Sequence, residues 1–317
     1  MSIYENFQPT NFDDIKTYKL ASRPSKVTVK DFAAPLNAGD SLKTFLDKLP
    51  NILAVQSIRE IASQIKRAKD LKKPIVWGIG GHVVKTGLAP IIVDLMEKGF
   101  VSAIASNGSV LVHDTEIALV GFTSEDVDAT LGTGDFGAAR ETGEILNAAA
   151  KNAMRDHIGL GEAMGKEVFA LTPPNAESSL LCQAYKNKIP FTAHLAIGAD
   201  IGHFHASCDG AALGASSHTD FRLFCSLVRV LNGGGVYLNI GSNVVLPEIF
   251  LKAVTVVRNL GFSLKDFTTA NFDFIQSYRP NTNVVRRPTT GGAGRGFSIT
   301  GHHELMIPLL AAHILCE

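Results

Sequence analysis

The sequence predicts an α/β protein built on a Rossmann-like open parallel sheet with helices on both faces. Two observations carry this prediction. Short apolar runs rich in β-branched residues alternate with helical patterns from Lys73 onward. Glycine-rich turns follow the first two of these runs. Alternation of this kind indicates parallel strands that are buried on both faces by the helices connecting them.

The elements can be assigned in order from their periodicity. The expected strands are short apolar runs at 74–79, 101–105, 167–170, 191–196, 236–240 and 266–269. The expected helices are amphipathic or rich in strong helix formers and span 88–98, 138–151, 179–185, 219–231 and 247–259. Residues 1–50 are less periodic and are predicted to wrap the surface. Residues 51–317 are then expected to form a single Rossmann-like domain.

Composition excludes several classes of protein. Lys plus Arg and Asp plus Glu both total 30, and a chain without net charge lacks the basic surplus of a nucleic-acid binder. Hydrophobic residues at 45% and charged residues at 19% are typical of a soluble globular protein, and no apolar run has the length of a membrane span. The polar start from Met1 to Asp14 lacks the pattern of a secretory signal. A cytoplasmic location with reduced thiols is expected, because no CxxC spacing joins Cys182, Cys208, Cys225 and Cys316.

Three predicted turns lie where open parallel sheets bind ligands, at the carboxyl ends of strands. Glycines in such turns let a phosphate approach the backbone, and small hydroxyl groups donate to it. The alternative is that these glycines only permit tight turns between a strand and the next helix and bind no ligand. The candidate cofactor-binding residues are Gly80, Gly81, Ser106, Asn107, Gly108, Ser109, Thr268, Thr269 and Ala270.

Several segments also follow one another in an informative order, namely 176–179, 184–190, 236–241, 268–270, 272–273, 279–280 and 308–310. In this order and spacing the chain resembles deoxyhypusine synthase, from about residue 70 to the end. The resemblance implies a sheet of the deoxyhypusine synthase type, NAD as the cofactor, transferase activity and a homotetramer. It also implies Asp114 as the replacement for the family's adenosine-side acid. A translation-factor partner would be expected only of a true member.

The chain departs from that family at its reactive centre. No lysine follows Lys265, although the family forms an imine with a lysine whose place falls near Arg286. An imine requires an amine with a lowered pKa, and arginine remains protonated. Cleavage of spermidine by the covalent route of the family is therefore not expected.

Arginines occupy the region where the family binds a polyamine. Their guanidinium groups, combined with the glycine-rich stretch 286–296, are suited to a phosphate or a carboxylate. A solvated glycine-rich loop with scattered charges is the alternative. The candidate substrate-binding residues are Arg279, Arg286, Arg287 and Arg295.

Histidines are the candidate proton-transfer groups. The resemblance places His203 and His302 where the family has acids, and His303 stands beside His302. His203 and His205 form an H-x-H pair within the polar cluster at 194–209, which gives a metal site as an alternative. His82 and His113 follow the first two glycine turns and are weaker candidates.

The sequence thus predicts a deoxyhypusine synthase-like protein that binds a nucleotide, NAD, and acts on a small anionic substrate. One alternative is a metal-dependent hydrolase or lyase using the cluster at 194–209. The other is a non-catalytic homologue that only binds a ligand. The G-x-G-x-x-G pattern at 132–137 does not follow a strand pattern, so a loop before the next helix is expected there.

Overall fold

The structure, a computed structural model, describes residues 6–316. It confirms the predicted fold class: six parallel strands form one open sheet in the order β3-β2-β1-β4-β5-β6. The strands are β1 (Ile75–Ile79), β2 (Ala103–Asn107), β3 (Phe191–His194), β4 (Gly235–Ile240), β5 (Phe267–Asp273) and β6 (Arg295–Thr300). This is the strand order of the doubly wound dinucleotide-binding folds, whose ligands bind where the order reverses.

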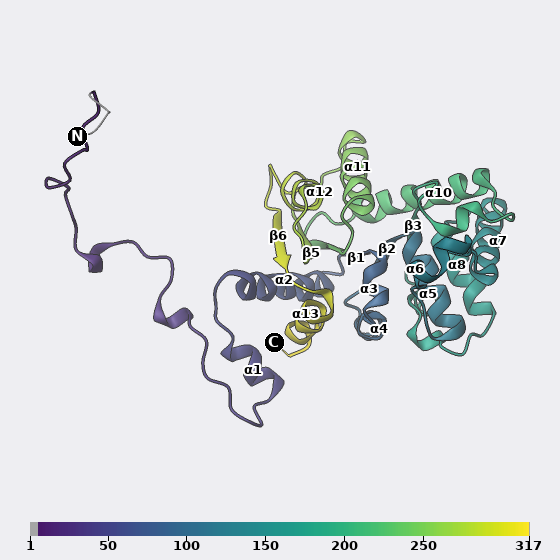
Figure 1. Cartoon of the computed structure of the whole chain (residues 1–317), viewed down its shortest axis with the longest axis horizontal. Helices are drawn as coiled ribbons and strands as arrows, with labels where there is room; N and C mark the ends of the chain where they lie inside the picture. Colours follow the sequence, from purple (N-terminus) through teal and green to yellow (C-terminus); the bar gives the residue numbers. More distant parts are fainter. Residues whose placement is uncertain (1–5, 317) are drawn as a thin grey trace.

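The helices connect the strands and cover the sheet (Figure 1). The α-helices are α1 (Leu42–Lys48), α2 (Leu53–Asp70), α3 (Gly81–Lys85), α4 (Ala89–Glu97), α5 (Gly108–Val120), α6 (Val127–Thr130), α7 (Arg140–Asp156), α8 (Leu160–Ala170), α9 (Leu180–Lys186), α10 (Gly210–Arg229), α11 (Val245–Asn259), α12 (Tyr278–Pro280) and α13 (His303–Cys316). The shorter turns are the 3-10 helices η1 (Leu20–Ser22), η2 (Val29–Asp31), η3 (Leu131–Thr133), η4 (Ala176–Ser178) and η5 (Ile201–Phe204), and the π-helix η6 (Asn281–Arg286).

The sheet separates two hydrophobic cores. Successive residues of a strand point to opposite faces, so Trp77 joins one core and Val76 the other. The first core contains apolar side chains from α2, α4, α5 and α13, and the second contains those from α10 and α11. Strand β1 is buried along its whole length, which explains its uninterrupted apolar sequence.

The free edge of β3 is closed by polar side chains of α10. The Asp220 carboxylate accepts hydrogen bonds from the Ala193 N–H of β3 at 2.8 Å and from the Gly161 N–H of α8 at 2.9 Å. The Ser217 hydroxyl accepts from the Leu195 N–H and donates to the Ala193 carbonyl, both at 3.0 Å. An edge strand normally leaves such groups unpaired, and here helix α10 satisfies them.

Several predicted elements were wrong. Residues 167–170 are the end of helix α8 and not a strand, because Leu160, Met164 and Val168 repeat at a helical spacing and are buried together. Helix α10 begins at Gly210, nine residues before the predicted start, since Asp209 caps its first turn. The last two residues of the expected glycine-rich stretch 286–296 begin strand β6 (Arg295–Thr300), which was not predicted, and helix α2 was not predicted either.

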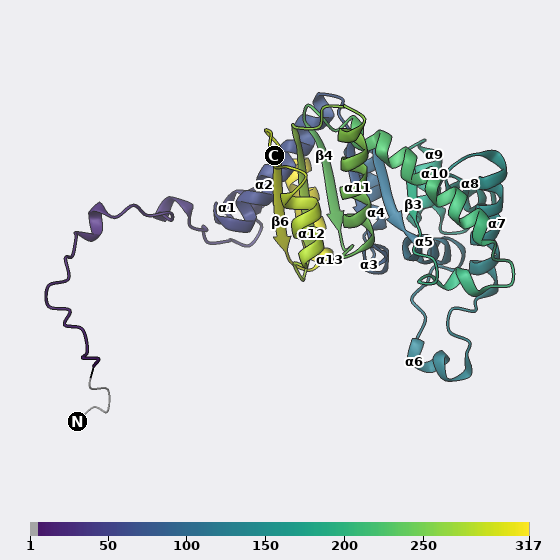
Figure 2. The ribbon, with the colours of Figure 1, turned by 90° about the horizontal axis from the view of Figure 1, so that it is seen from above.

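The N-terminal residues 6–40 lead away from the sheet (Figures 1 and 2). Helix α1, which follows them, packs on α13. The first five residues of the segment predicted to wrap the surface lie outside the described residues, and the domain boundary at residue 50 stays a prediction. The four cysteines are unpaired. Among residues 6–316, no helix has the combination of length and apolarity that crossing a bilayer requires.

Helix α10 contains a position where a stabilising substitution is expected. Gly214 is exposed in the helix interior, and an added Cβ would have no neighbour within 4 Å. Gly214→Ala should raise the free energy of unfolding by about 0.5–1 kcal/mol, because alanine loses less backbone entropy on folding. Urea denaturation measures this. Gly261→Ala is the matched control: it too has open space, but its φ of +82° makes a destabilising effect the expected one.

Candidate functional site

The candidate site lies at the carboxyl edge of the sheet, between the paired strands β1 and β4. The chain leaving β1 continues to β2 on one side, and the chain leaving β4 continues to β5 on the other. The turns after these two strands touch: an added Cβ on Gly80 would lie 2.1 Å from the Gly241 carbonyl oxygen. The Gly80 N–H also donates to the Ile240 carbonyl at 2.9 Å. Only glycine fits at this contact. The close approach leaves backbone, and no side chain, facing a ligand above the switch point.

A second glycine contact connects the turns after β1 and β2. A Cβ on Gly81 would lie 2.4 Å from the Ser109 hydroxyl. Helix α5 begins at Gly108 behind the cap Asn107, whose side-chain oxygen accepts from the Val110 N–H and the Ser109 hydroxyl. The first turn of α5 is therefore held close to the turn after β1.

A carboxylate from another loop lies against the start of α5. The nearest oxygen of Asp200 would be 2.2 Å from a Cβ on Gly108, so this glycine makes room for the acid. The Asp200 side chain is 13% exposed, and an oxygen lies 4.0 Å from His203 Nε2. Burial raises the pKa of Asp200. The carboxylate thus stands beside the end of β2, a strand that itself ends in Asn107 rather than in an acid.

An aromatic cluster lies on the other side of the switch point. The ring centroids of His82 and His303 are 5.5 Å apart, and Phe274 stacks on His302 at 5.8 Å. The His303 ring also packs on Gly241, since its Cε1 would lie 3.0 Å from a Cβ there. The cluster therefore combines residues that follow β1, β5 and β6.

Several buried polar atoms in this region have no hydrogen-bond partner within residues 6–316. Among them are Oδ2 of Asp273 and Nδ1 of His303, on side chains that are each 1% exposed, and Oδ1 of Asn239 below them. The other carboxylate oxygen of Asp273 accepts from the Phe274 N–H, and His303 Nε2 is 3.1 Å from the Phe272 carbonyl. Burial lowers the pKa of His303. Buried polar atoms without partners are costly, and a bound ligand is one way to satisfy them.

Beneath the cluster, amides connect β4 to β5. Asn239 donates to the Asn271 side-chain oxygen at 2.7 Å and to the Ser242 carbonyl at 2.8 Å. Asn271 donates to Gln276 at 2.8 Å, and Gln276 donates to the Ile299 carbonyl at 2.9 Å. These bonds fix the turns after β4 and β5 relative to one another.

A cavity of about 200 Å³ adjoins the start of α5. Its polar lining includes Lys85, Ser109, Glu116 and Asp200. His113 lines it as well, with Nδ1 2.8 Å from the Thr123 hydroxyl. Burial, reinforced by Lys85, lowers the pKa of His113 to about 4, so its imidazole is neutral at pH 7.

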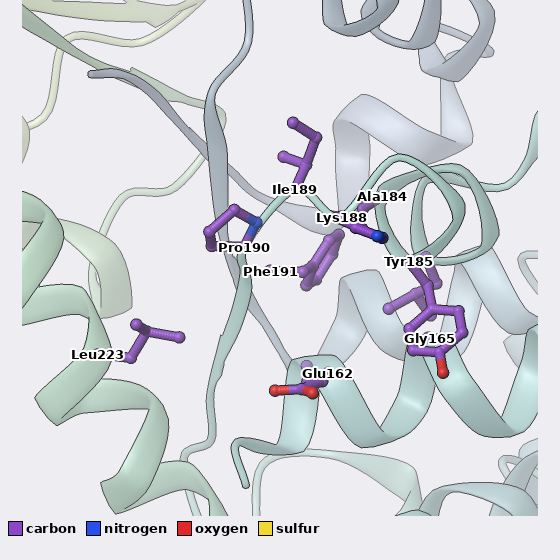
Figure 3. A pocket seen from close by; sticks show the side chains of 11 residues that line it. Glu162, Gly165, Ala184, Tyr185, Lys188, Ile189, Pro190, Phe191 and Leu223 are labelled. Carbon is purple, nitrogen blue, oxygen red and sulfur yellow. The ribbon is translucent and has the colours of Figure 1, made fainter. Parts of the chain in front are cut away.

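Another cavity, of about 360 Å³, lies at the opposite, amino end of β3 (Figure 3). Its wall is mainly apolar and includes Pro190, Phe191 and Leu223, while Glu162 and Lys188 add charges. It is larger than the cavity beside α5, but it is remote from the strand ends where the glycine turns and the histidines converge. We therefore place the candidate site at the carboxyl edge.

The predicted cofactor residues are divided between the two ends of the sheet. Gly80, Gly81, Gly108 and Ser109 are at the carboxyl edge, as described above. Thr268, Thr269 and Ala270 were expected in a turn, but they lie within β5, which continues to Asp273. Placing these three residues in a turn was wrong, because the predicted strand 266–269 covers only the first part of β5. The Thr269 hydroxyl donates to the Val284 carbonyl.

Ser106 and Asp114 make contacts within the protein. The Ser106 hydroxyl in β2 donates to the Thr192 carbonyl. The Asp114 carboxylate accepts from the Ser179 hydroxyl and from two backbone N–H groups at the start of α9. Burial raises the pKa of Asp114 to about 6. Asp114 thus stabilises the amino end of α9, and its role toward a cofactor stays a prediction.

The four predicted substrate arginines do not converge. Arg295 opens β6 at the amino end of the sheet and pairs with Glu60 at 2.7 Å. Arg279 lies 3.4 Å from Glu248, and Arg287 donates to the Asn283 side chain at 2.9 Å. Arg286 ends the π-helix. The connection between β5 and β6 must return to the amino end of a parallel sheet, and this carries residues 286–294 away from the carboxyl edge.

The predicted histidines also lie in separate places. His203 follows β3 and its Nδ1 accepts from the Gly198 N–H, whereas His302 and His303 follow β6 at the other edge of the sheet. His205 Nε2 is 3.0 Å from the Gly137 carbonyl, and its ring packs on Gly143. In the described part of the chain, no three His, Cys, Asp or Glu side chains are grouped as metal ligands.

Sequence reasoning missed Asp273 and Phe274 as site residues, underrated His82 and gave Asp200 no role at the start of α5. A strand extended by three residues beyond Ala270 would have placed the first two at its carboxyl end. The position of Asp200 has no local signal, because it depends on how the loop after β3 folds back on α5.

Comparison with known proteins gives a different relationship from the predicted one. A family described as "Arginine dihydrolase ArgZ-like, C-terminal, Rossmann fold" matches residues 59–191. An ornithine cyclodeaminase of Methanothermobacter thermautotrophicus is 29% identical over 137 residues, which are 43% of this chain and 30% of the relative. The bifunctional arginine dihydrolase/ornithine cyclodeaminase AgrE of Nostoc sp. is 23% identical over 134 residues, which are 42% of this chain and 17% of AgrE. The chain therefore matches less than a third of either curated relative.

Solved structures agree on the fold. A ternary complex of AgrE with ornithine and NAD+ has a TM-score of 0.52 at 17% identity, covering 82% of this chain and 32% of AgrE. A protein assigned as a deoxyhypusine synthase, from Entamoeba histolytica, has a TM-score of 0.50 at 11% identity, covering 89% of this chain and 95% of that one. Likeness at these identities shows a shared fold.

The assignment to the deoxyhypusine synthase family is wrong, because the matching family is arginine dihydrolase ArgZ-like and the curated relatives are ornithine cyclodeaminases. The transferase activity and the small anionic substrate inferred with it are wrong for the same reason, and so are the metal-dependent and non-catalytic alternatives. Glycine turns after strands recur in any doubly wound sheet, so the segments behind that resemblance reported the fold and not the family. The homotetramer stays a prediction.

Proposed function

We propose that this chain binds NAD across the carboxyl edge of its sheet and forms part of an enzyme that releases ammonia from ornithine or a closely related basic amino acid. One observation carries the proposal. The glycine turns after β1 and β4 meet at the switch point, beside a buried carboxylate and a buried imidazole that each have an unpaired polar atom. The matched residues 59–191 include the first of these turns, and AgrE, whose fold is similar over 32% of its chain, forms a complex with ornithine and NAD+.

The residues present fit a dinucleotide. The bare backbone at Gly80 and Gly81 supports a pyrophosphate, as in dinucleotide folds generally. Strand β2 ends without an acid, and Asp200 beside Gly108 supplies a carboxylate for a ribose hydroxyl. When bound, NAD would accept a hydride and return it. This assignment gives Asp200 the role that sequence reasoning had given to Asp114.

The other side of the switch point fits an amino-acid substrate. Oδ2 of Asp273 can accept from a substrate ammonium group, and Nδ1 of His303 can exchange a proton with a nearby group. The stacked rings of Phe274 and His302, both of them exposed to solvent, flank one side of this position and offer it an aromatic face. The amide contacts from Asn239 to Gln276 hold both turns in place.

Titration calorimetry with NAD, followed by assay of ammonia release from ornithine, tests the proposal. We expect saturable binding of NAD that Asp200→Asn weakens about tenfold, the order of one lost charge-assisted hydrogen bond. Asp273→Asn should retain NAD binding and lose ammonia release. Asp135→Asn, an exposed carboxylate in the loop before α7, is the matched control and should change neither.

Each result has a distinct meaning. Absence of NAD binding to the folded chain would refute the proposal at its first step. Binding of NAD without any ammonia release, with ornithine at saturating concentration, would retain the dinucleotide site and reject the reaction. An Asp273→Asn variant with full activity would remove this carboxylate from the substrate site.

A further inference from the structure

The N-terminal arm, residues 6–40, combines exposed apolar side chains with a run of positive charge. Phe12, Tyr18, Leu20 and Val29 are between 70% and 80% exposed. Between residues 15 and 30 the arm has no acidic residue, and its basic residues are Lys16, Lys19, Arg23, Lys26 and Lys30. Large apolar side chains in such number are not left in water without a partner surface.

The arm is attached to the domain only at its end. The hydrogen bonds of residues 6–30 are local, such as those from the Ser22 hydroxyl to the Lys19 carbonyl and from the Thr28 N–H to the Asp31 carboxylate. Contacts with the domain begin at Asp31, whose carbonyl accepts from the Asn51 N–H, and at Ala34, whose N–H donates to the Lys48 carbonyl. The arm thus has the geometry of a tether whose apolar part is available to another surface.

A surface of complementary character lies around α6, which we call the acidic lobe (residues 119–144). A cavity of about 550 Å³ opens there between α5 and α7, and its apolar lining includes Leu119, Val120 and Phe122. Phe122 is 72% exposed and Val120 is 52% exposed. The lobe contains one basic residue, Arg140, and its acids are Glu125, Asp126, Asp128, Asp135, Glu141 and Glu144.

We propose that the basic stretch of the arm of one copy, residues 15–30, docks on the acidic lobe of a second copy, so that two copies exchange arms. The charges are opposite, and both surfaces expose apolar side chains that need cover. The arm and α6 lie at opposite ends of the long axis in both views (Figures 1 and 2), which favours docking between copies over folding back within one chain. A reciprocal exchange satisfies both arms and both lobes of a two-fold dimer.

Charge reversal tests the proposal in the full chain by sedimentation velocity. The wild type should sediment as a dimer at micromolar concentration and dissociate as salt is raised, because screening weakens the contact. An arm variant with Lys16→Glu, Lys19→Glu and Lys26→Glu should be monomeric. A lobe variant with Asp128→Lys, Glu141→Lys and Glu144→Lys, all exposed positions, leaves three acids against four basic residues in the lobe and should also be monomeric.

Mixing the two variants gives the decisive result. An equimolar mixture should restore the dimer, since each acidic arm then meets a basic lobe and each basic arm meets an acidic lobe. Lys43→Glu with Lys66→Glu, outside the arm and the lobe, is the matched control and should leave the dimer unchanged.

Several outcomes would overturn the inference. The first is a wild type that is still monomeric at about 100 µM, a concentration at which even a weak association would be populated. The second is a dimer that persists in the arm variant, and the third is a mixture of the two variants that stays monomeric. A monomeric wild type that binds vesicles of anionic lipid, and loses this binding in the arm variant, would assign the arm to a membrane surface. Loss of NAD binding alone would leave the inference intact.

Discussion

Replacing Gly80 with alanine is expected to abolish NAD binding and to lower the free energy of unfolding by about 1–3 kcal/mol. The added methyl group would lie 2.1 Å from the Gly241 carbonyl oxygen, which is backbone and cannot rotate away. The turns after β1 and β4 must therefore separate. Calorimetric titration with NAD and urea denaturation measure the two effects.

The control for this variant is Gly132→Ala, whose Cβ would have no neighbour within 4 Å. Both variants add one methyl group to a turn, so only the contact at the switch point differs. NAD affinity close to that of the wild type in Gly80→Ala would mean that the dinucleotide does not depend on this contact, and the site would have to be sought elsewhere.

Replacing Asp220 with alanine is expected to destabilise the protein by about 2–5 kcal/mol. Its carboxylate accepts from the N–H groups of Gly161 and Ala193, and alanine leaves both buried donors without this partner. Asp220→Asn retains an acceptor oxygen and should lose less. Denaturation in urea at pH 7 compares the two variants, and an equal loss in both would mean that the acceptor is not what α10 contributes.

The same carboxyl group should give the stability a distinctive dependence on pH. Burial raises the pKa of Asp220 to about 7, whereas its ordinary value of 3.8 applies in the unfolded chain. Between these values the folded state retains a proton that the unfolded state has released, so the contribution to stability is complete below about pH 4 and is lost as pH rises through about 7.

The unfolding free energy of the wild type relative to Asp220→Asn should therefore fall between pH 4 and pH 7, by up to about 4 kcal/mol. Comparing the two proteins removes the other titrating groups, including Asp114, whose raised pKa acts in the same direction. A difference in unfolding free energy that stays constant or increases between pH 4 and pH 7 would show that the pKa of Asp220 is not raised in the folded protein.

The sequence was sufficient for five of the six strands, β1 to β5, and insufficient for β6 and for the site. Strand β1 is a continuous apolar run, and β4 is apolar except for Asn239; both are buried along their whole length, so their pattern identifies them without further knowledge. Helix α8 was mistaken in part for a strand because four residues of an apolar helix face cannot be distinguished from a short strand by periodicity alone.

The site depends on contacts between residues distant in the chain. Gly80 and Gly108 were predicted because each follows a strand directly. Asp200 reaches Gly108 through the fold of a loop, and Asp273 reaches the switch point because β5 is longer than its apolar run suggests. Neither feature has a local sequence pattern. The four arginines are not gathered in one place, because Arg295 lies at the amino end of the sheet, whereas Arg279 and Arg287 share the contacts of Glu248 and Asn283.

The position of β1 in the sheet has a consequence for how the protein acquires its structure. Its neighbour β4 pairs Val236 with Ile75, about 160 residues away in the chain. During synthesis, strands β1, β2 and β3 are made before β4, so one side of β1 has no partner strand until β4 emerges. Pairing β1 with β4 closes a loop of about 160 residues, and closing a loop of this length is slow. Residues 59–191 alone would retain that open side and lack most of β3. The segment matched by the family is therefore not expected to fold alone, and the proposed NAD crevice between the turns after β1 and β4 forms only after β4 has been synthesised.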